Sequence, residues 1–133
     1  MTDIFTRRKR SQIMSKIRSK DTGIEIVILK ELKSRSLKDF VRYAELPGKP
    51  DFVFRKQHIA VFCDGDFWHG YKFGSWNRKL NKFWRTKITS NITRDRKNRV
   101  MLRKAGWKVL RLWGHEIKKN PSKCVDWIEA IMG

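Results

Sequence analysis

The stretch 46–69, which reads LPGKPDFVFRKQHIAVFCDGDFWH, constrains the fold of this chain more than any other part of it. It begins with a turn built on two prolines and a glycine and continues with two short apolar runs, 52–54 and 59–63. Short apolar runs joined by a tight polar turn are typical of paired antiparallel strands. Asp51 at the start of the first run and Asp64 after the second are therefore expected at the same end of a sheet.

Apolar periodicity on both sides of this stretch predicts the remaining elements. Residues that recur every three or four positions indicate helices, and an alternating run indicates a strand. Gly106 is a plausible helix stop, and residues 65–79, rich in glycine and aromatic residues, have no regular period and are predicted to form a loop. In chain order we expect a short helix from Ser11, a helix from Thr22, an antiparallel meander of strands at 40–44, 52–54 and 59–63, a helix over 80–104, a strand over 107–113 and a closing helix from Pro121.

The charge balance indicates a polyanionic partner. The chain has 32 Lys and Arg residues against 13 Asp and Glu residues, a net charge of +19. Each basic side chain that neutralises a phosphate adds affinity by releasing counterions, so nucleic acid is the expected partner. A solvated basic surface or a ribosomal-type RNA-binding protein would have a similar composition. Residues 1–10 form a basic N-terminal arm that contains Arg7, Arg8, Lys9 and Arg10. This arm either contacts phosphates or remains solvated.

Length and hydropathy predict one domain in the cytoplasm. The 133 residues suffice for a single domain over 1–133, and with 40% hydrophobic residues the chain can bury a core, which argues against a disordered basic tail. No apolar run approaches the ~20 residues of a membrane span, and the N-terminus lacks the apolar stretch of a signal peptide. Cys63 and Cys124 lack the paired spacing of a zinc module, so we expect both to be reduced core residues.

Three polar residues on the predicted helices admit both a structural and a functional interpretation. Glu25 lies three residues after Thr22, the spacing of a capping box, which favours a structural role. Glu25 also adjoins the apolar face of its helix, where it can look into an active site. Asn91 and Asp95 share a helix face with apolar residues. Asp95 can simply pair with Arg99 on the surface, but if that face turns inward both polar groups need a partner or a task.

The polar groups of the central stretch suit phosphodiester hydrolysis. This reaction requires a metal ion that polarises the phosphate, a nucleophilic water and a group that protonates the leaving oxygen. Asp51, Asp64 and a nearby strand-end carbonyl are hard oxygen ligands of the kind that Mg²⁺ prefers. Histidine titrates near neutral pH, so His69 is a candidate general acid or base, although a lone loop histidine is more often a surface residue. The aromatic residues of the loop either stack on bases or pack on the core.

Several different short motifs occur along the chain, and their order and spacing resemble those of one nuclease family. They are Asp21-Thr22 with Glu25, the run from Leu46 to Phe52, Val61-Phe62 with Gly65, Phe67-Trp68-His69, Phe83-Trp84, Asn91, Arg94-Asp95-Arg96 and Gly106-Trp107. The element order with Pro50-Asp51 at the head of the second strand resembles the PD-(D/E)XK nuclease core. The whole set resembles the Vsr (very short patch repair) endonucleases over nearly the entire chain.

This resemblance implies an α/β fold with a restriction-endonuclease-like core, αβββαβ, in which helices flank a mixed sheet. It implies a Mg²⁺-dependent endonuclease that nicks one strand of double-stranded DNA, in the well-known members beside a T:G mismatch. Mn²⁺ is expected to substitute for Mg²⁺. We further expect a monomer on DNA in the cytoplasm, associated with the nucleoid, with repair or host-system proteins as compatible partners and no membrane association.

The resemblance also assigns roles to single residues. Asp51 would be the central metal ligand, helped by the backbone carbonyl of Cys63, and Asp64 would be a second metal carboxylate. His69 would serve in acid/base chemistry. Residues that would hold water molecules or orient the site are Glu25, Asn91 and Asp95. The aromatic side chains that such enzymes push into the duplex match Phe67, Trp68 and Trp84.

The sequence departs from the family pattern in two places. Asp64 stands where the mismatch-repair members have a histidine, which puts a His-pair mechanism in doubt. The positions of the family's structural zinc site hold Asp66, Tyr71, Phe73 and His115. We therefore expect no structural zinc and a loop held by aromatic packing, and the inference to T:G specificity is weakened. These departures also leave open a non-catalytic DNA- or RNA-binding module on a nuclease-like scaffold.

Overall fold

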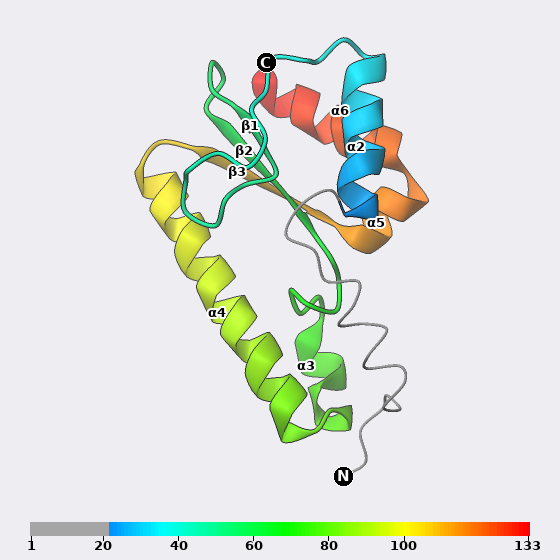
Figure 1. Cartoon of the computed structure of the whole chain (residues 1–133), viewed down its shortest axis with the longest axis vertical. Helices are drawn as coiled ribbons and strands as arrows, with labels where there is room; N and C mark the ends of the chain where they lie inside the picture. Colours follow the sequence, from blue (N-terminus) through cyan, green and yellow to red (C-terminus); the bar gives the residue numbers. More distant parts are fainter. Residues whose placement is uncertain (1–21) are drawn as a thin grey trace.

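The structure of the protein, a computed structural model, describes residues 22–133. Within this range a mixed sheet carries helices on both faces (Figure 1). The predicted α/β class is confirmed, and the arrangement is consistent with a restriction-endonuclease-like core. Outside the described residues lie the helix predicted from Ser11 and the basic arm, with Arg7, Arg8, Lys9 and Arg10.

The sheet has three strands in the order β1-β2-β3. β1 (Phe52–Phe54) pairs antiparallel with β2 (Ile59–Asp64), as the short apolar runs predict. β2 pairs parallel with β3 (Lys108–Trp113). Parallel strands require a crossover, which here contains the long helix α4 (Lys82–Lys104), and they end at the same edge of the sheet.

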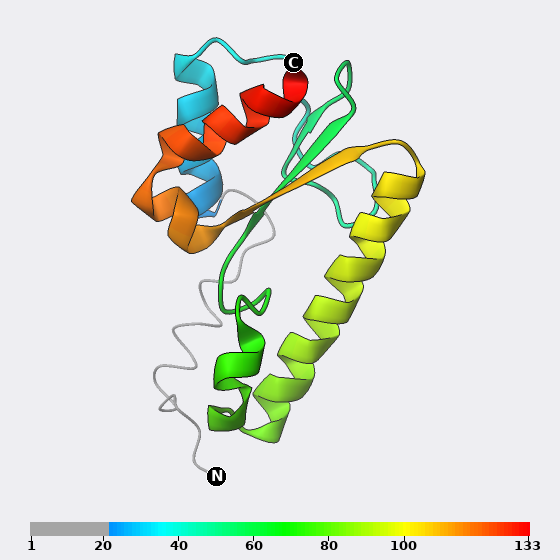
Figure 2. The same ribbon diagram turned by 180° about the vertical axis from the view of Figure 1, so that it is seen from behind.

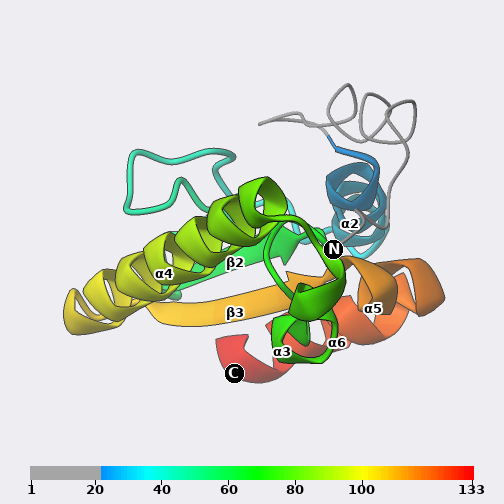
Figure 3. The same ribbon diagram turned by 90° about the horizontal axis from the view of Figure 1, so that it is seen from below.

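Helices cover the sheet from both sides. On one face lie α2 (Gly23–Ser34), α5 (Gly114–Lys119) and α6 (Pro121–Met132), and α4 crosses the other face, as Figure 3 shows. Alternate strand residues point to opposite faces, so every second side chain of β1 and β2 enters the layer below α2 and α6. The buried core of that layer consists of Ile28, Leu32, Phe52, Phe54, Ile59, Val61, Cys63, Leu112, Ile117, Cys124, Val125 and Ile128.

Complete burial of one such apolar side chain contributes about 1.5–3 kcal/mol. Cys63 and Cys124 are both buried and free, which confirms their prediction as reduced core residues.

Local signals define both ends of α4. The Asn81 side chain accepts a hydrogen bond from the Trp84 backbone N–H at 3.1 Å and so caps the first turn. At the other end Gly106 has φ 92°, in the left-handed region, and the next backbone N–H, of Trp107, returns to the Leu102 carbonyl. The N-terminal half of α4 extends beyond the sheet, with the short helix α3 (Phe73–Trp76) beside it (Figures 1 and 2).

The prediction of a strand at 40–44 is wrong. Only Val41 pairs with the sheet there, in an isolated bridge to Val53. Tyr43 has φ 54°, in the left-handed region, and this interrupts an extended run. Phe40 still packs on the sheet, with its ring centroid 5.3 Å from that of Phe52. The apolar side chains therefore cover the sheet without forming a third strand of the meander.

Residues 65–79 are also more regular than predicted. They contain α3 and a 3-10 helix, Asn77–Lys79. Helix α5 was not predicted either, because elements of one or two turns contain too few residues to reveal a helical period. None of the helices between residues 22 and 133 combines the length and the apolar character that crossing a bilayer requires.

Candidate active site

The turn before β1 places Asp51 against the end of β2. Gly48 in this turn has φ 79°, and a Cβ at this position would lie 3.1 Å from side-chain atoms of both Phe62 and Asn98. Any other residue at this position would be strained and would have to displace Phe62 or Asn98. Directly after the turn, Asp51 Oδ2 accepts a hydrogen bond from the backbone N–H of Cys63 at 2.6 Å.

Asp51 lies in an acidic and largely dry environment. Burial, together with the nearby carboxylates of Glu25 and Asp64, raises its pKa to about 8, although the hydrogen bond from the N–H of Cys63 acts in the opposite direction. Asp51 and Asp64 thus lie close enough to interact, as their positions at the two strand ends predict. Without a positive charge beside Asp51, the charge of Asp64 disfavours the ionised form of Asp51.

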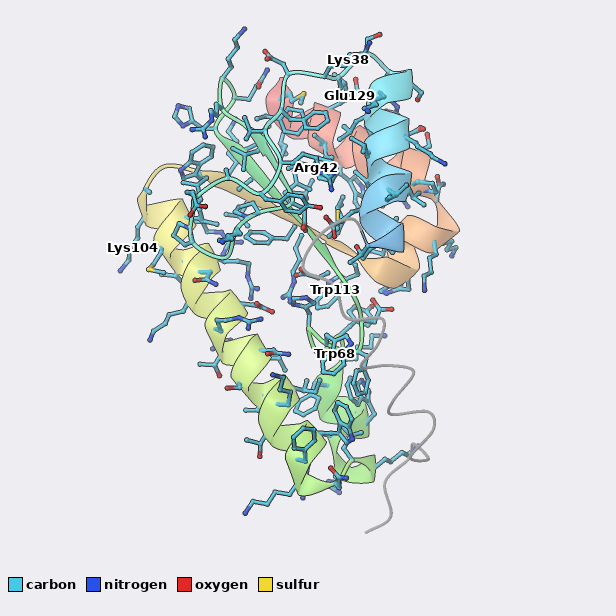
Figure 4. All side chains as sticks on the ribbon, in the orientation of Figure 1. Lys38, Arg42, Trp68, Lys104, Trp113 and Glu129 are labelled. Carbon is cyan, nitrogen blue, oxygen red and sulfur yellow. The ribbon has the colours of Figure 1, made fainter. Side chains whose placement is uncertain are left out.

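Glu25 combines the two interpretations that its sequence position allows. Its Oε2 accepts hydrogen bonds from the Thr22 backbone N–H at 3.2 Å and from the Thr22 hydroxyl at 2.7 Å, as a helix cap. Its Oε1 accepts from Tyr43 at 2.6 Å and from Arg42 at 3.1 Å. Figure 4 shows Arg42 between the strands and α2. This buried carboxylate caps α2 and also interacts electrostatically with Asp51.

His69 lies between two carboxylates. Its Nδ1 is 2.6 Å from Oδ2 of Asp95, and its Nε2 is 3.6 Å from Oδ1 of Asp64. Burial alone would raise the pKa of Asp95, but the hydrogen bond and charge of His69 lower it below the ordinary value. A carboxylate at Nδ1 orients the imidazole and leaves Nε2 available on the side of Asp64.

Arg111 on β3 contacts the carboxylates of both Asp64 and Asp95. Its Nε donates to Oδ2 of Asp64 at 2.5 Å, and its Nη2 lies 3.5 Å from Oδ2 of Asp95 and 3.4 Å from the backbone oxygen of His69. The guanidinium also stacks on the Trp113 ring, 4.0 Å from its centroid. One guanidinium therefore holds three components of the site in fixed positions.

The inner face of α4 turns its polar residues toward the sheet, as the functional interpretation predicts. Asn91 is buried, and its amide donates to the Trp68 backbone oxygen at 2.9 Å. Asp95 pairs with His69 and Arg94. Among residues 22–133 no ion pair joins Asp95 to Arg99, so the surface-pair interpretation of Asp95 is wrong.

Aromatic rings gather beside α3 and the start of α4. The Phe67 ring stacks on Trp76 with centroids 5.6 Å apart, and Trp68 lies 5.5 Å from Trp84. Trp84 is only 1% exposed, whereas its neighbour Phe83 is 59% exposed. Of the aromatic residues predicted to enter DNA, Phe67 and Trp68 are partly exposed and Trp84 is buried in the cluster that they form. Trp68 is labelled near α3 in Figure 4.

These groups surround a pocket of about 890 Å³ between α2, the end of β2 and α4. Seven of the predicted site residues line it: Glu25, Asp51, Cys63, Asp64, Trp68, His69 and Asp95. Asn91, Phe67 and Trp84 lie outside the lining. Basic side chains contribute to the same wall, namely Lys49, Arg94, Arg99 and Lys118. An acidic floor with a basic wall suits a metal ion together with a phosphate.

The side chains of Asp64, His69 and Asp95 offer ligand atoms that all lie within 4.8 Å of one another, so this cluster could hold a metal ion. Asp51 brings a further carboxylate to the same pocket. Hard oxygen donors dominate the combined set, which fits a divalent cation of the Mg²⁺ or Mn²⁺ type.

Comparisons with known proteins show the family of this chain. Residues 2–78 match the family described as DNA mismatch endonuclease Vsr. The chain belongs to the Vsr family. It is 41% identical over 134 residues to the type II nicking enzyme V.NmeAIP of Neisseria meningitidis serogroup A, with coverage of 99% of this chain and 95% of that enzyme. It is 35% identical over 115 residues to the DNA mismatch endonuclease Vsr of Escherichia coli, with coverage of 85% and 74%.

Of the four positions that the sequence resemblance matched to a structural zinc site, Asp66, Tyr71 and His115 lie together. Asp66 Oδ1 is 3.0 Å from Nδ1 of His115, and the Tyr71 ring packs 4.4 Å from the His115 ring. Phe73 packs edge-on against Trp76 instead. Hydrogen bonds and ring contacts thus connect this part of the loop, and the absence of a structural zinc stays a prediction.

Neither Arg111 nor Arg99 was predicted from the sequence to be a site residue. Burial lowers the pKa of Arg99, and the neighbouring charge of Arg111 acts in the same direction. One signal was present in the strand predicted at 107–113, because an arginine between apolar residues of a strand is unusual and, where it is largely buried, needs an acidic partner. That partner, Asp64, lies 47 residues away.

Proposed function

We propose that this Vsr family member is a Mg²⁺-dependent endonuclease that nicks one strand of double-stranded DNA. The observation that carries the proposal is the buried carboxylate of Asp51, whose pKa is raised to about 8 by burial and by Glu25 and Asp64. A group perturbed in this way within a pocket is a candidate for catalysis or metal binding. The names of the relatives, which include type II nicking enzymes, support cleavage of one strand.

The proposed metal ligands are Asp51, the backbone carbonyl of Cys63 and Asp64. When bound, Mg²⁺ would polarise the phosphate and stabilise the charge that develops on it. Mn²⁺ has similar ligand preferences and should replace it. Because Arg111 occupies Oδ2 of Asp64, the other oxygen, Oδ1, remains for the ion or for His69.

We assign proton transfer to Nε2 of His69. Asp95 accepts the hydrogen bond at Nδ1, which favours the tautomer with its proton on Nδ1 and leaves Nε2 free to exchange a proton with water or with the leaving oxygen. Asn91 positions the loop through the Trp68 carbonyl, and Glu25 holds the start of α2 against the pocket. Phe67, Trp68 and Trp84 form the aromatic cluster proposed to contact unstacked bases, at or near a T:G mismatch.

The same proposal treats residues 1–133 as one endonuclease domain that acts as a monomer on DNA. Its basic arm would contact phosphates, and the protein would be cytoplasmic and associated with the nucleoid. Repair or host-system proteins are compatible further partners. Membership of a family described as DNA mismatch endonucleases favours an enzyme over the non-catalytic DNA- or RNA-binding module considered from the sequence.

The test is a plasmid-nicking assay with Mg²⁺, Mn²⁺ or EDTA, followed by a set of duplexes that carry each mismatch beside a matched duplex. Nicking should require the metal, and Asp51→Asn should abolish it while DNA binding persists. The control is Asp39→Asn, because Asp39 is an exposed carboxylate that pairs with Lys56 and does not line the pocket. Cleavage at the wild-type rate by Asp51→Asn would refute the assignment.

A further inference from the structure

The exposed face of α4 carries a row of basic and hydroxyl side chains, of which Arg94 alone also lines the active-site pocket. The basic members are Lys82, Arg85, Arg94 and Lys97, and all four are exposed. Between them lie four short hydroxyl side chains, those of Thr86, Thr89, Ser90 and Thr93, which are also exposed. Together they line a shallow groove, called here the α4 strip.

The spacing makes the α4 strip continuous along the helix. Its members recur every three or four residues from Lys82 to Lys97, which places them on one face. At 1.5 Å per residue this face is about 22 Å long, enough to follow several phosphates of one DNA strand. The buried residues of α4, such as Trp84 and Ile88, point to the opposite side.

Among residues 22–133, Arg94 is the only basic member of the α4 strip that pairs with a carboxylate, that of Asp95. Helix α4 contains nine Lys and Arg residues and one acidic residue, Asp95, which pairs with His69. In the part of the chain from 22 to 133, no carboxylate lies within 4.0 Å of the charged nitrogens of Lys82, Arg85 or Lys97. Like charges at helical spacing repel each other, and a polyanion along the groove would remove this repulsion.

The hydroxyl residues favour an extended phosphate backbone as the occupant. Their side chains are short, so a backbone can approach the helix closely, and they donate hydrogen bonds to phosphate oxygens while the flanking Lys and Arg residues supply charge. The lining of the groove contains none of the large apolar side chains that would favour a protein partner.

Arg94 connects the α4 strip to the active site, because this residue lines both the groove and the pocket that contains Asp51. We propose that the α4 strip is a second DNA contact, which holds the sugar-phosphate backbone of the same duplex whose scissile strand enters the pocket past Arg94. This inference rests on the proposed nicking of DNA and adds the path of the substrate across α4.

The test is the salt dependence of DNA binding by the full chain in EDTA, with a matched duplex as the probe. The variant combines Lys82→Gln, Arg85→Gln and Lys97→Gln, since glutamine has a helix propensity close to that of Lys and Arg. Arg94 remains unchanged because it borders the pocket. The slope of log affinity against log salt concentration should become smaller by up to about 2.7, at 0.9 per lost phosphate contact. The nicking rate at saturating DNA should stay within about twofold of wild type.

The matched control removes three exposed lysines elsewhere, with Lys30→Gln, Lys33→Gln and Lys38→Gln at the far end of α2 and in the segment after it. Figure 4 shows Lys38 at the end of the molecule away from α3. This control has the same net charge as the first variant but should keep most of the wild-type slope. Equal losses of slope in the two variants, or no loss in the first, would overturn the inference.

A second variant tests the hydroxyl groups without any change of charge. Thr89→Val with Thr93→Val should weaken duplex binding several-fold with the slope unchanged, because hydrogen bonds to phosphate are lost while ionic contacts remain. Unchanged affinity would overturn the proposed role of these hydroxyls. If the wild-type protein binds DNA with the expected slope but does not nick it with any metal, the proposed nicking activity is refuted, whereas the proposed DNA contact on the α4 strip is retained. An RNA duplex that binds equally well with the same slope would refute its assignment to DNA.

Discussion

Arg111 and Asp64, on neighbouring parallel strands, form a close ion pair, in which Nε of Arg111 donates to Oδ2 of Asp64 at 2.5 Å. The Asp64 side chain is 7% exposed and that of Arg111 is 19% exposed, so water screens the pair poorly. Asp64 replaces the histidine of the family pattern and brings a negative charge into an already acidic pocket. Arg111 offsets that charge and holds Asp64, Asp95 and the backbone of His69 together.

Removal of Arg111 should cost stability as well as activity. Arg111→Leu removes the guanidinium that neutralises the buried carboxylate of Asp64, and we expect a loss of roughly 3 kcal/mol in the free energy of unfolding by urea. Arg111→Leu combined with Asp64→Asn should recover part of this loss, because neither charge then remains. A single variant that unfolds at the wild-type urea concentration would show that the pair is unimportant for stability.

The metal-free protein should lose stability as pH rises from about 5 to about 8. The pKa of Asp51 is raised in the folded state to about 8, so across this range the folded chain binds more protons than the unfolded one. One such group contributes at most about 1.4 kcal/mol per pH unit. Urea unfolding in EDTA at several pH values measures the slope, which Asp51→Asn should reduce. Mg²⁺ should stabilise the protein more at pH 8 than at pH 6, because it binds the ionised carboxylate.

Exchange of Asp95 for asparagine should separate binding from catalysis. Asp95→Asn keeps the shape of the side chain but no longer favours the His69 tautomer with a proton on Nδ1. We expect the rate at saturating DNA to fall about a hundredfold, with duplex affinity within a few-fold of wild type. The matched control is Asp126→Asn on α6, an exposed acidic residue outside the pocket. Equal rates for Asp95→Asn and wild type would remove Asp95 from the mechanism.

Replacement of Trp84 by alanine should reduce stability, whereas replacement of Phe83 should reduce DNA binding. Trp84 is 1% exposed in the aromatic cluster, and Trp84→Ala should cost about 3–5 kcal/mol of stability. Phe83 is 59% exposed, so Phe83→Ala should change stability by less than about 0.5 kcal/mol while it weakens binding to mismatched duplexes. Urea unfolding and duplex titration of both variants measure the two effects. If Phe83→Ala binds every duplex like wild type, the exposed aromatic ring is not a DNA contact.

The two functions of Glu25 can also be separated. Thr22→Ala removes a hydroxyl donor to Glu25 and should cost about 1 kcal/mol without loss of nicking. Glu25→Ala removes the acceptor of Thr22, Arg42 and Tyr43 and should cost more, and it should also reduce nicking at least tenfold. Nicking that falls equally in both variants, in proportion to stability, would leave Glu25 with a structural role alone.

Local interactions made part of this site predictable from the sequence. The turn at Gly48 and the hairpin of β1 and β2 involve neighbouring residues, so local interactions are sufficient to place Asp51 beside Cys63. The Thr22 and Glu25 cap and the stop of α4 at Gly106 depend on three- or four-residue spacings in the same way.

Only the tertiary structure decided the remaining features, because they depend on the register between segments that are distant in sequence. The pairing of β2 with β3 brings Arg111 to Asp64 across 47 residues, and no local pattern specifies that register. Packing of the loop on α4 likewise buries Trp84 and exposes Phe83, although adjacent aromatic residues have similar hydrophobicity. At 40–44 the side chains satisfied a strand pattern, but the left-handed conformation of Tyr43, whose hydroxyl donates to Glu25, prevented a strand.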